Sequence, residues 1–132
     1  MNSDFFCFNT REASHRLILL HGWGADADDL APLGQSLING INPKIEICLL
    51  RAPQKNPQGM GRQWYPLFPA EWAEVPSAVK ALKNRVKEMA TEEIPLDKTV
   101  ILGFSQGGAM ALAAGCSLPL AGLICCSAYP HP

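Results

Sequence analysis

The last quarter of the chain lacks strongly charged side chains, because residues 99–132 contain no Asp, Glu, Lys or Arg. Charge is scarce in the whole chain too, at 17% of residues and a formal net charge of −1. A chain without a basic excess has no general electrostatic attraction for nucleic acid or for acidic membrane surfaces. The composition therefore predicts no nucleic-acid partner.

The N-terminus lacks the features of a signal peptide, since residues 1–8 contain neither a basic segment nor a long apolar stretch. Residues 108–128 are uncharged and long enough for a membrane helix. However, Pro119 interrupts them, and Gly, Ala, Ser and Cys dominate rather than Leu and Phe. We interpret the stretch as a buried helix, a loop and a buried strand, and we expect no membrane span.

The sequence has five cysteines, and their spacing does not match that of metal ligands. They are Cys7, Cys48, Cys116, Cys125 and Cys126. An odd set without a redox motif predicts reduced, mostly buried thiols, no metal site and a cytoplasmic protein.

What the sequence does contain is an alternation of short aliphatic runs with longer periodic segments. Four runs suit parallel strands covered on both faces, and a weaker one opens the chain. The runs are residues 16–21, 45–50, 99–104 and 121–127, with the weaker one at 5–9. With 132 residues, there is room for one domain. We predict a single α/β domain over residues 1–132, with a mostly parallel sheet.

Helical patterns lie between these runs. Leucines recur on one face of residues 30–38, with Asp26 or Asp28 as a possible N-cap and Gly40 as a terminator. Apolar residues repeat at intervals of three and four over residues 79–89, and small residues follow Gln106. These patterns predict helices on both faces of the sheet.

The predicted catalytic residue lies in a sharp turn between a strand and a helix. The sequence GFSQG at residues 103–107 matches the G-x-S-x-G nucleophile elbow, after an aliphatic run and before a small-residue helix. This context predicts that Ser105 is a nucleophile at the C-terminal edge of the sheet. The partial positive charge of the helix N-terminus would stabilise a developing oxyanion there.

A second element, HGWG at residues 21–24, follows the first strong strand. Such a loop supplies one backbone N–H to the oxyanion hole, and the residue after the nucleophile supplies the other. The predicted donors are therefore the amides of Trp23 and Gln106. We expect His21 to shape this loop rather than to act as the general base. In folds with such a nucleophile elbow, the base comes after the nucleophile in the sequence, whereas His21 comes before it.

Five segments resemble one family in their order along the chain. They are LHGWGADADDL (20–30), RAPQ (51–54), GRQWYPL (61–67), GFSQGGAMAL (103–112) and AGLICCSAYP (121–130). The chain resembles the phospholipase/carboxylesterase family of α/β-hydrolases, which includes acyl-protein thioesterases. The resemblance implies a cofactor-free serine hydrolase that acts on a small acyl ester or thioester. It also implies that residues 61–67 border the acyl groove, where Trp64 either contacts substrate or serves in packing.

The rest of the triad is missing. An α/β-hydrolase places its acid and then its base after the serine, yet the last acidic residue here is Asp97. Asp97 should lie at the sheet edge opposite Ser105, whereas His131 should emerge on the same edge. We therefore predict a C-terminally truncated, partial α/β-hydrolase fold with its last strands missing and its activity impaired. A non-catalytic remnant or binding module, and an enzyme completed by a second chain, are the alternatives.

The truncation predicts an exposed apolar edge at the strand that holds Leu123. Unpaired strand edges template association with other chains. We expect the isolated chain to be marginally stable, to aggregate, or to pair through this edge with a second polypeptide, which includes self-association.

Overall fold

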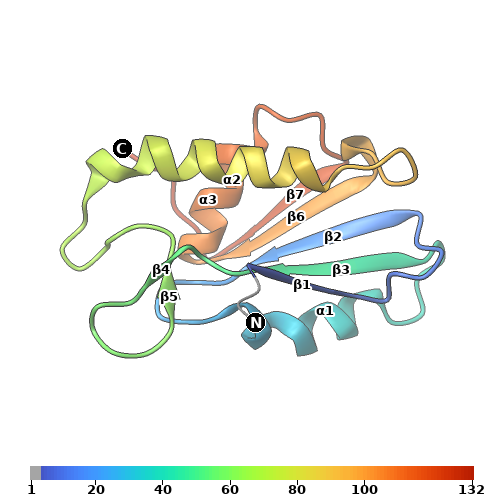
Figure 1. Cartoon of the computed structure of the whole chain (residues 1–132), viewed down its shortest axis with the longest axis horizontal. Coiled ribbons are helices and arrows are strands. Elements are labelled where there is room, and N and C mark those ends of the chain that lie inside the picture. The colour runs from blue at the N-terminus through green and yellow to red at the C-terminus, as the bar shows by residue number, and fades with distance from the viewer. Residues whose placement is uncertain (1–3) are drawn as a thin grey trace.

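A five-stranded sheet forms the centre of the computed structural model, which describes residues 4–132 (Figure 1). In spatial order its strands are β1 (Phe5–Phe8), β3 (Ile45–Leu50), β2 (His15–Leu20), β6 (Thr99–Phe104) and β7 (Gly122–Cys126). Strand β1 runs antiparallel to β3, and all other neighbours are parallel. The strands expected from the aliphatic runs are confirmed, as is the mostly parallel sheet.

Helices cover both faces of this sheet, as predicted. Helix α1 (Ala31–Ile38) lies on one face, and α2 (Val75–Met89) and α3 (Gln106–Gly115) lie on the other (Figure 1). Two apolar clusters result, because alternate residues of a strand point to opposite faces. Ile18 of β2 packs in the cluster that contains residues of α2 and α3, whereas Leu19 packs in the other cluster.

The segment before α1 differs slightly from the expected helix. Asp26 caps a 3-10 turn, η1 (Ala27–Leu30), and α1 begins directly after it. The Asp26 carboxylate accepts a hydrogen bond from the Ala27 amide, while Asp29 accepts one from the Asp26 amide. The Asp26 side chain also accepts from the Asp29 amide, which completes a reciprocal capping box and satisfies amides that the helix itself cannot.

The long loop over residues 51–69 is ordered by a small hairpin. Strands β4 (Gln54–Lys55) and β5 (Arg62–Gln63) pair antiparallel within it. Two further 3-10 turns, η2 (Trp72–Glu74) and η3 (Leu96–Lys98), precede α2 and β6. The hairpin brings the loop back against the HGWG segment, where the Gly24 amide donates to the Arg62 carbonyl at 2.8 Å.

The expectation of five reduced thiols is wrong. Cys7 and Cys48 form a disulfide between β1 and β3, while Cys116, Cys125 and Cys126 are free. The expected burial is wrong as well, because Cys116 and Cys125 are exposed. The physical reason for the disulfide is register, because Cys7 lies directly opposite Cys48 in the antiparallel pair. Their separation of 41 residues along the chain gave no sign of this proximity.

Strand β7 forms the other edge of the sheet. Ile124 on this strand is 46% exposed, although it is a large apolar side chain. Self-association through this edge stays a prediction. The stretch over residues 108–128 forms most of α3, a loop and β7, so the order of elements is confirmed, but β7 is partly exposed and the expectation of a buried strand is wrong. No helix within residues 4–132 has the length and apolarity needed to cross a bilayer.

Candidate active site

Ser105 occupies a strained turn between β6 and α3. Its backbone has φ 56° and ψ −116°, a region that non-glycine residues rarely adopt and that costs about 1–3 kcal/mol. Its amide donates to the Cys126 carbonyl at 2.9 Å, which ties the turn to the end of β7. Although Ser105 is the N-cap residue of α3, its side chain makes no capping hydrogen bond. The hydroxyl is therefore not consumed by the helix that it precedes.

Two glycines allow this turn to form. A Cβ on Gly103 would overlap the backbone of Gly107 and Gly108, since the strand end and the helix start are in close contact. A Cβ on Gly107 would overlap the carbonyl groups of Leu20 and His21. The absence of both side chains thus lets β6, α3 and the end of β2 meet through their backbones.

The HGWG segment lies beside Ser105. A Cβ on Gly22 would lie 3.4 Å from the Ser105 Cβ and 3.3 Å from the Phe104 carbonyl oxygen. The Trp23 amide has no main-chain acceptor within residues 4–132. Gln106 is the first residue of α3, so its amide has no acceptor inside the helix. The two amides expected to bind an oxyanion thus come from segments that converge on Ser105.

The side chain of Gln106 has a role that the sequence did not reveal. It is fully buried, accepts a hydrogen bond from the Trp64 amide at 2.9 Å and donates to the Tyr65 carbonyl at 2.8 Å. One amide side chain thereby satisfies two backbone groups of the 51–69 loop. Gln106 fixes this loop against the first turn of α3.

Trp64 is buried, with 2% of its surface exposed. Its indole N–H donates to the His21 carbonyl at 2.8 Å, and its ring lies in the core cluster beneath α2 and α3. Of the two roles considered for Trp64, packing describes the position of its ring in this structure. Contact with an acyl chain stays a prediction.

Both ring nitrogens of His21 bind backbone groups. Nδ1 lies 2.8 Å from the Gly22 carbonyl oxygen, and Nε2 accepts from the Ala52 amide at 3.0 Å. These partners require the neutral ring with its proton on Nδ1. Burial lowers the pKa of His21 below its ordinary value. The geometry matches the loop-shaping role expected for His21.

This neutral histidine predicts a loss of stability at mildly acidic pH. The pKa of His21 is lower in the folded than in the unfolded chain, so the unfolded state binds more protons below about pH 6.5. The free energy of unfolding should therefore fall as pH drops from 7.5 to 5.5, by up to about 1.4 kcal/mol per pH unit for one histidine. Urea unfolding at several pH values measures this slope.

Burial also lowers the pKa of His131, which adds a contribution of the same sign. The His131→Gln variant removes that contribution and should keep most of the slope, because His21 is the more deeply buried ring. Carboxylates titrate mainly below this range. A flat profile in His131→Gln would contradict the assignment to His21.

His131 is hydrogen-bonded to Tyr65 rather than to Ser105. Its Nε2 lies 2.9 Å from the Tyr65 hydroxyl, which in turn lies 2.6 Å from the Tyr129 hydroxyl. Burial, followed by the hydrogen bond to Tyr129, raises the pKa of Tyr65 well above its ordinary value. Within residues 4–132, no hydrogen bond joins His131 to Ser105.

Asp97 lies at the opposite end of β6 from Ser105, as expected. It belongs to η3, which directly precedes the strand, whereas Ser105 follows it. Six residues of strand separate the two ends by about 20 Å. Asp97 therefore cannot orient a base beside Ser105.

One group of three potential metal ligands occurs within residues 4–132, formed by Cys7, Glu46 and Cys48, whose ligand atoms lie within 4.8 Å of one another. The two sulfurs are joined in the disulfide, and a Glu46 oxygen lies 2.6 Å from Nε of Arg16. These groups are thus engaged with protein partners, and they are remote in sequence from the Ser105 turn.

A hollow of about 260 Å³ lies beside the oxyanion loop. Trp23 lines it together with Leu67 and Phe68, and the Trp23 and Phe68 rings meet edge to face at 5.0 Å. Gln63 holds the Trp23 indole by accepting its N–H at 3.1 Å. Sequence reasoning missed Gln63 and Phe68, because only the hairpin brings them to residue 23.

Known proteins resemble this chain in family and in fold. The family model described as Phospholipase/Carboxylesterase matches residues 5–131. The structure of esterase PE8 superposes with a TM-score of 0.76 at 27% identity, covering 96% of this chain and 69% of that one. A carboxylesterase from Mesorhizobium loti gives a TM-score of 0.71 at 23% identity, with coverages of 87% and 55%. No curated protein sequence matches the chain significantly.

A third structure extends the same pattern. A phospholipase/carboxylesterase from Dyadobacter fermentans gives a TM-score of 0.74 at 19% identity, with 98% of this chain and 62% of that chain covered. The chain thus spans between 55% and 69% of the length of these three proteins. Its mostly parallel sheet with helices on both faces matches part of the α/β-hydrolase fold. Because the family model covers nearly all of its residues, the chain belongs to the phospholipase/carboxylesterase family.

Proposed function

We propose that this chain is a serine hydrolase of carboxylic esters or acyl thioesters, with Ser105 as the nucleophile. One observation carries the proposal: the Ser105 hydroxyl makes no capping bond although its residue begins α3. A serine at an N-cap usually spends its oxygen on the helix. Here a strained backbone turns it away, which is the arrangement that an exposed nucleophile requires.

The reaction would begin with attack of the Ser105 oxygen on the acyl carbonyl carbon. The carbonyl oxygen would take the negative charge and accept hydrogen bonds from the Trp23 and Gln106 amides. Each donor of this kind is worth roughly 2.7–4 kcal/mol of transition-state stabilisation. The alcohol or thiol would then leave, and water would release the acid from the acyl-enzyme. The proposed reaction needs no cofactor or metal.

Turnover by residues 1–132 alone is proposed to be impaired. A serine hydrolase needs a base that is oriented by a carboxylate, and loss of that orientation costs about 10⁴-fold in turnover. The printed sequence has no acidic residue after Asp97, and His131 binds the Tyr65 hydroxyl. Both facts support slow acylation of Ser105.

The acyl group is proposed to lie over the hollow beside Trp23. Leu67 and Phe68 offer apolar surface there, and Phe68 is 62% exposed. Ser105 does not line this hollow, so a bound acyl chain would extend from the serine toward it. The walls alone do not select between an oxygen ester and a thioester.

Labelling by a fluorophosphonate probe tests the nucleophile. The folded chain should be labelled slowly, because attack on the phosphorus needs the same activated hydroxyl and the same oxyanion donors. The Ser105→Ala variant should show no labelling, and Ser117→Ala should be labelled like the unmodified chain. Mass spectrometry of the labelled peptide and a circular dichroism spectrum of each variant complete the measurement.

Absence of labelling in the folded chain would reject the hydrolase proposal. It would favour the alternative of a non-catalytic remnant or binding module, which retains the turn without an activated serine. A cytoplasmic location is also proposed. The Cys7–Cys48 disulfide argues against this part of the proposal, because disulfides persist mainly in oxidising compartments.

A further inference from the structure

The Cys7–Cys48 disulfide lies away from the proposed active site, at the β1 edge of the sheet. The two residues are direct partners across the strands, with their Cα atoms 4.3 Å apart. Cys48 is completely buried, whereas Cys7 is partly exposed. Cys48 thus offers no surface to an approaching molecule, whereas Cys7 does.

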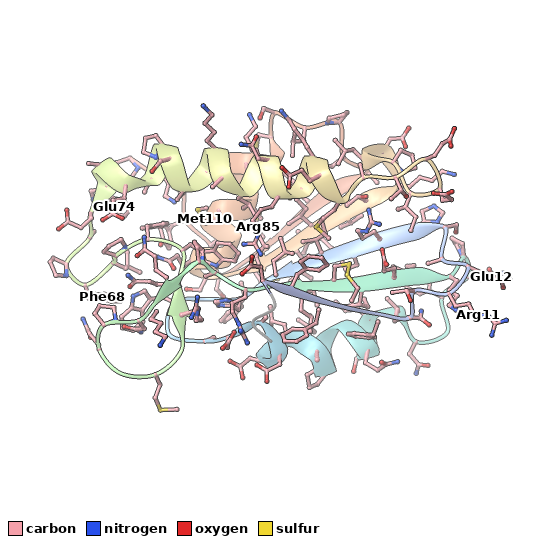
Figure 2. All side chains as sticks on the ribbon, viewed as in Figure 1. Arg11, Glu12, Phe68, Glu74, Arg85 and Met110 are labelled. Carbon is pink, nitrogen blue, oxygen red and sulfur yellow. A yellow bond between two sulfur atoms is a disulfide. The ribbon has the colours of Figure 1, made fainter. Side chains whose placement is uncertain are left out.

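A cavity of about 420 Å³ adjoins the disulfide. Both cysteines line it, together with Arg85 and Glu88 of α2. Figure 2 shows Arg85 reaching from α2 toward the sheet, and it draws the disulfide as a yellow bond. Cavities of this volume are large enough to bind a small organic molecule.

The cavity walls carry both signs of charge. Arg16 and Glu46 form an ion pair with Nε and Oε2 2.6 Å apart, and both residues are nearly buried. The Arg85 guanidinium donates to the Asp4 carbonyl at 2.6 Å, and the exposed Glu88 carboxylate lies on the same helix. A molecule with both an amine and a carboxylate is complementary to a cavity that Arg85 and Glu88 line together.

We propose that the disulfide and this cavity form a thiol–disulfide exchange site for a small zwitterionic thiol, of the chemical class of glutathione or cysteine. The thiolate of that molecule attacks Cys7 Sγ and forms a new S–S bond with it. The Cys7–Cys48 bond breaks, and Cys48 Sγ leaves with the electron pair and takes a proton from water. The positive charge of Arg85, which lines the same cavity, favours the leaving thiolate, and the Glu46 carboxylate beside the sulfurs is neutralised by its ion pair with Arg16. The product is Cys7 as a mixed disulfide and Cys48 as a thiol.

Trypsin digestion can locate the adduct in the unmodified chain. Cleavage after Arg11, Lys44, Arg51 and Lys98 places Cys7 in peptide 1–11, Cys48 in peptide 45–51 and the other three cysteines in peptide 99–132. The folded protein is incubated with glutathione, quenched with acid, alkylated and digested. We expect the glutathione adduct on peptide 1–11 and an alkylated thiol on peptide 45–51.

Thiol selectivity tests the role of the cavity. At equal thiolate concentration, glutathione should open the disulfide roughly tenfold faster than 2-mercaptoethanol, which is the effect of one charge-assisted hydrogen bond. The Glu88→Gln variant should lose most of this preference. The Glu92→Gln variant is the matched control, because Glu92 does not line the cavity, and it should keep the preference.

Several results would overturn the proposal. These are equal rates with the two thiols, an adduct mainly on Cys48, opening only in denaturant, and a cysteine pair that is already reduced in the isolated protein. Circular dichroism of Glu88→Gln shows that a lost preference is not a loss of folding.

Discussion

The Gly107→Ala substitution is expected to lower the free energy of unfolding by at least about 3 kcal/mol and to abolish probe labelling of Ser105. The added Cβ would overlap the carbonyl groups of Leu20 and His21. These are backbone atoms at the end of a central strand, so no side-chain rotation relieves the overlap. The helix must move away from β2, and the Gln106 amide moves with it. Urea unfolding and fluorophosphonate labelling measure the two effects.

The Gly122→Ala variant is the matched control. A Cβ at this position has its nearest neighbour at 3.9 Å, the Cγ2 of Val100, which is an ordinary contact distance. Its stability should stay within about 1 kcal/mol of the unmodified chain, since alanine removes some freedom from the unfolded state. If Gly107→Ala were as stable as this control, the close backbone contact between α3 and β2 would be wrong.

The central strands β3, β2 and β6 could be predicted because both of their faces are covered, whereas the edge strands β1 and β7 are partly exposed. A strand buried on both faces must be apolar at nearly every position, which makes a run such as residues 45–50 visible in the sequence. The turn at residues 103–107 was also visible, since backbone contact there admits only glycine at two positions. Local steric constraints of this kind restrict which residue types can occupy a position, so they can be read from the sequence.

Contacts that depend on strand register could not be read from the sequence. The pairing of Cys7 with Cys48 follows from how the antiparallel edge strand aligns with β3, and no local pattern fixes that alignment. The same holds for the Gln106 side chain, whose partners at Trp64 and Tyr65 belong to a loop more than 40 residues earlier. Such long-range polar contacts are consistent with many residue types, so one sequence cannot single them out.

Reduction of the Cys7–Cys48 disulfide is expected to lower the free energy of unfolding by about 4 kcal/mol. The bond closes a loop with a separation of 41 residues. By chain entropy, loops between 15 and 100 residues contribute roughly 3 to 4.7 kcal/mol, because the cross-link restricts the unfolded chain. Urea unfolding with and without a reductant measures the difference. The Cys125→Ser variant is the control, since that thiol is free and exposed and its loss should change little.

The folded state should persist after reduction, because β1 has other attachments. The Asp4 carbonyl, just before β1, accepts hydrogen bonds from the Arg51 amide at 2.8 Å and from Arg85 at 2.6 Å. The native circular dichroism spectrum should therefore change little, while the slope of unfolding free energy with urea should rise as the reduced unfolded chain expands. A loss of native spectrum on reduction would instead mean that the disulfide holds the folded sheet together. Unchanged stability would mean that the bond is absent.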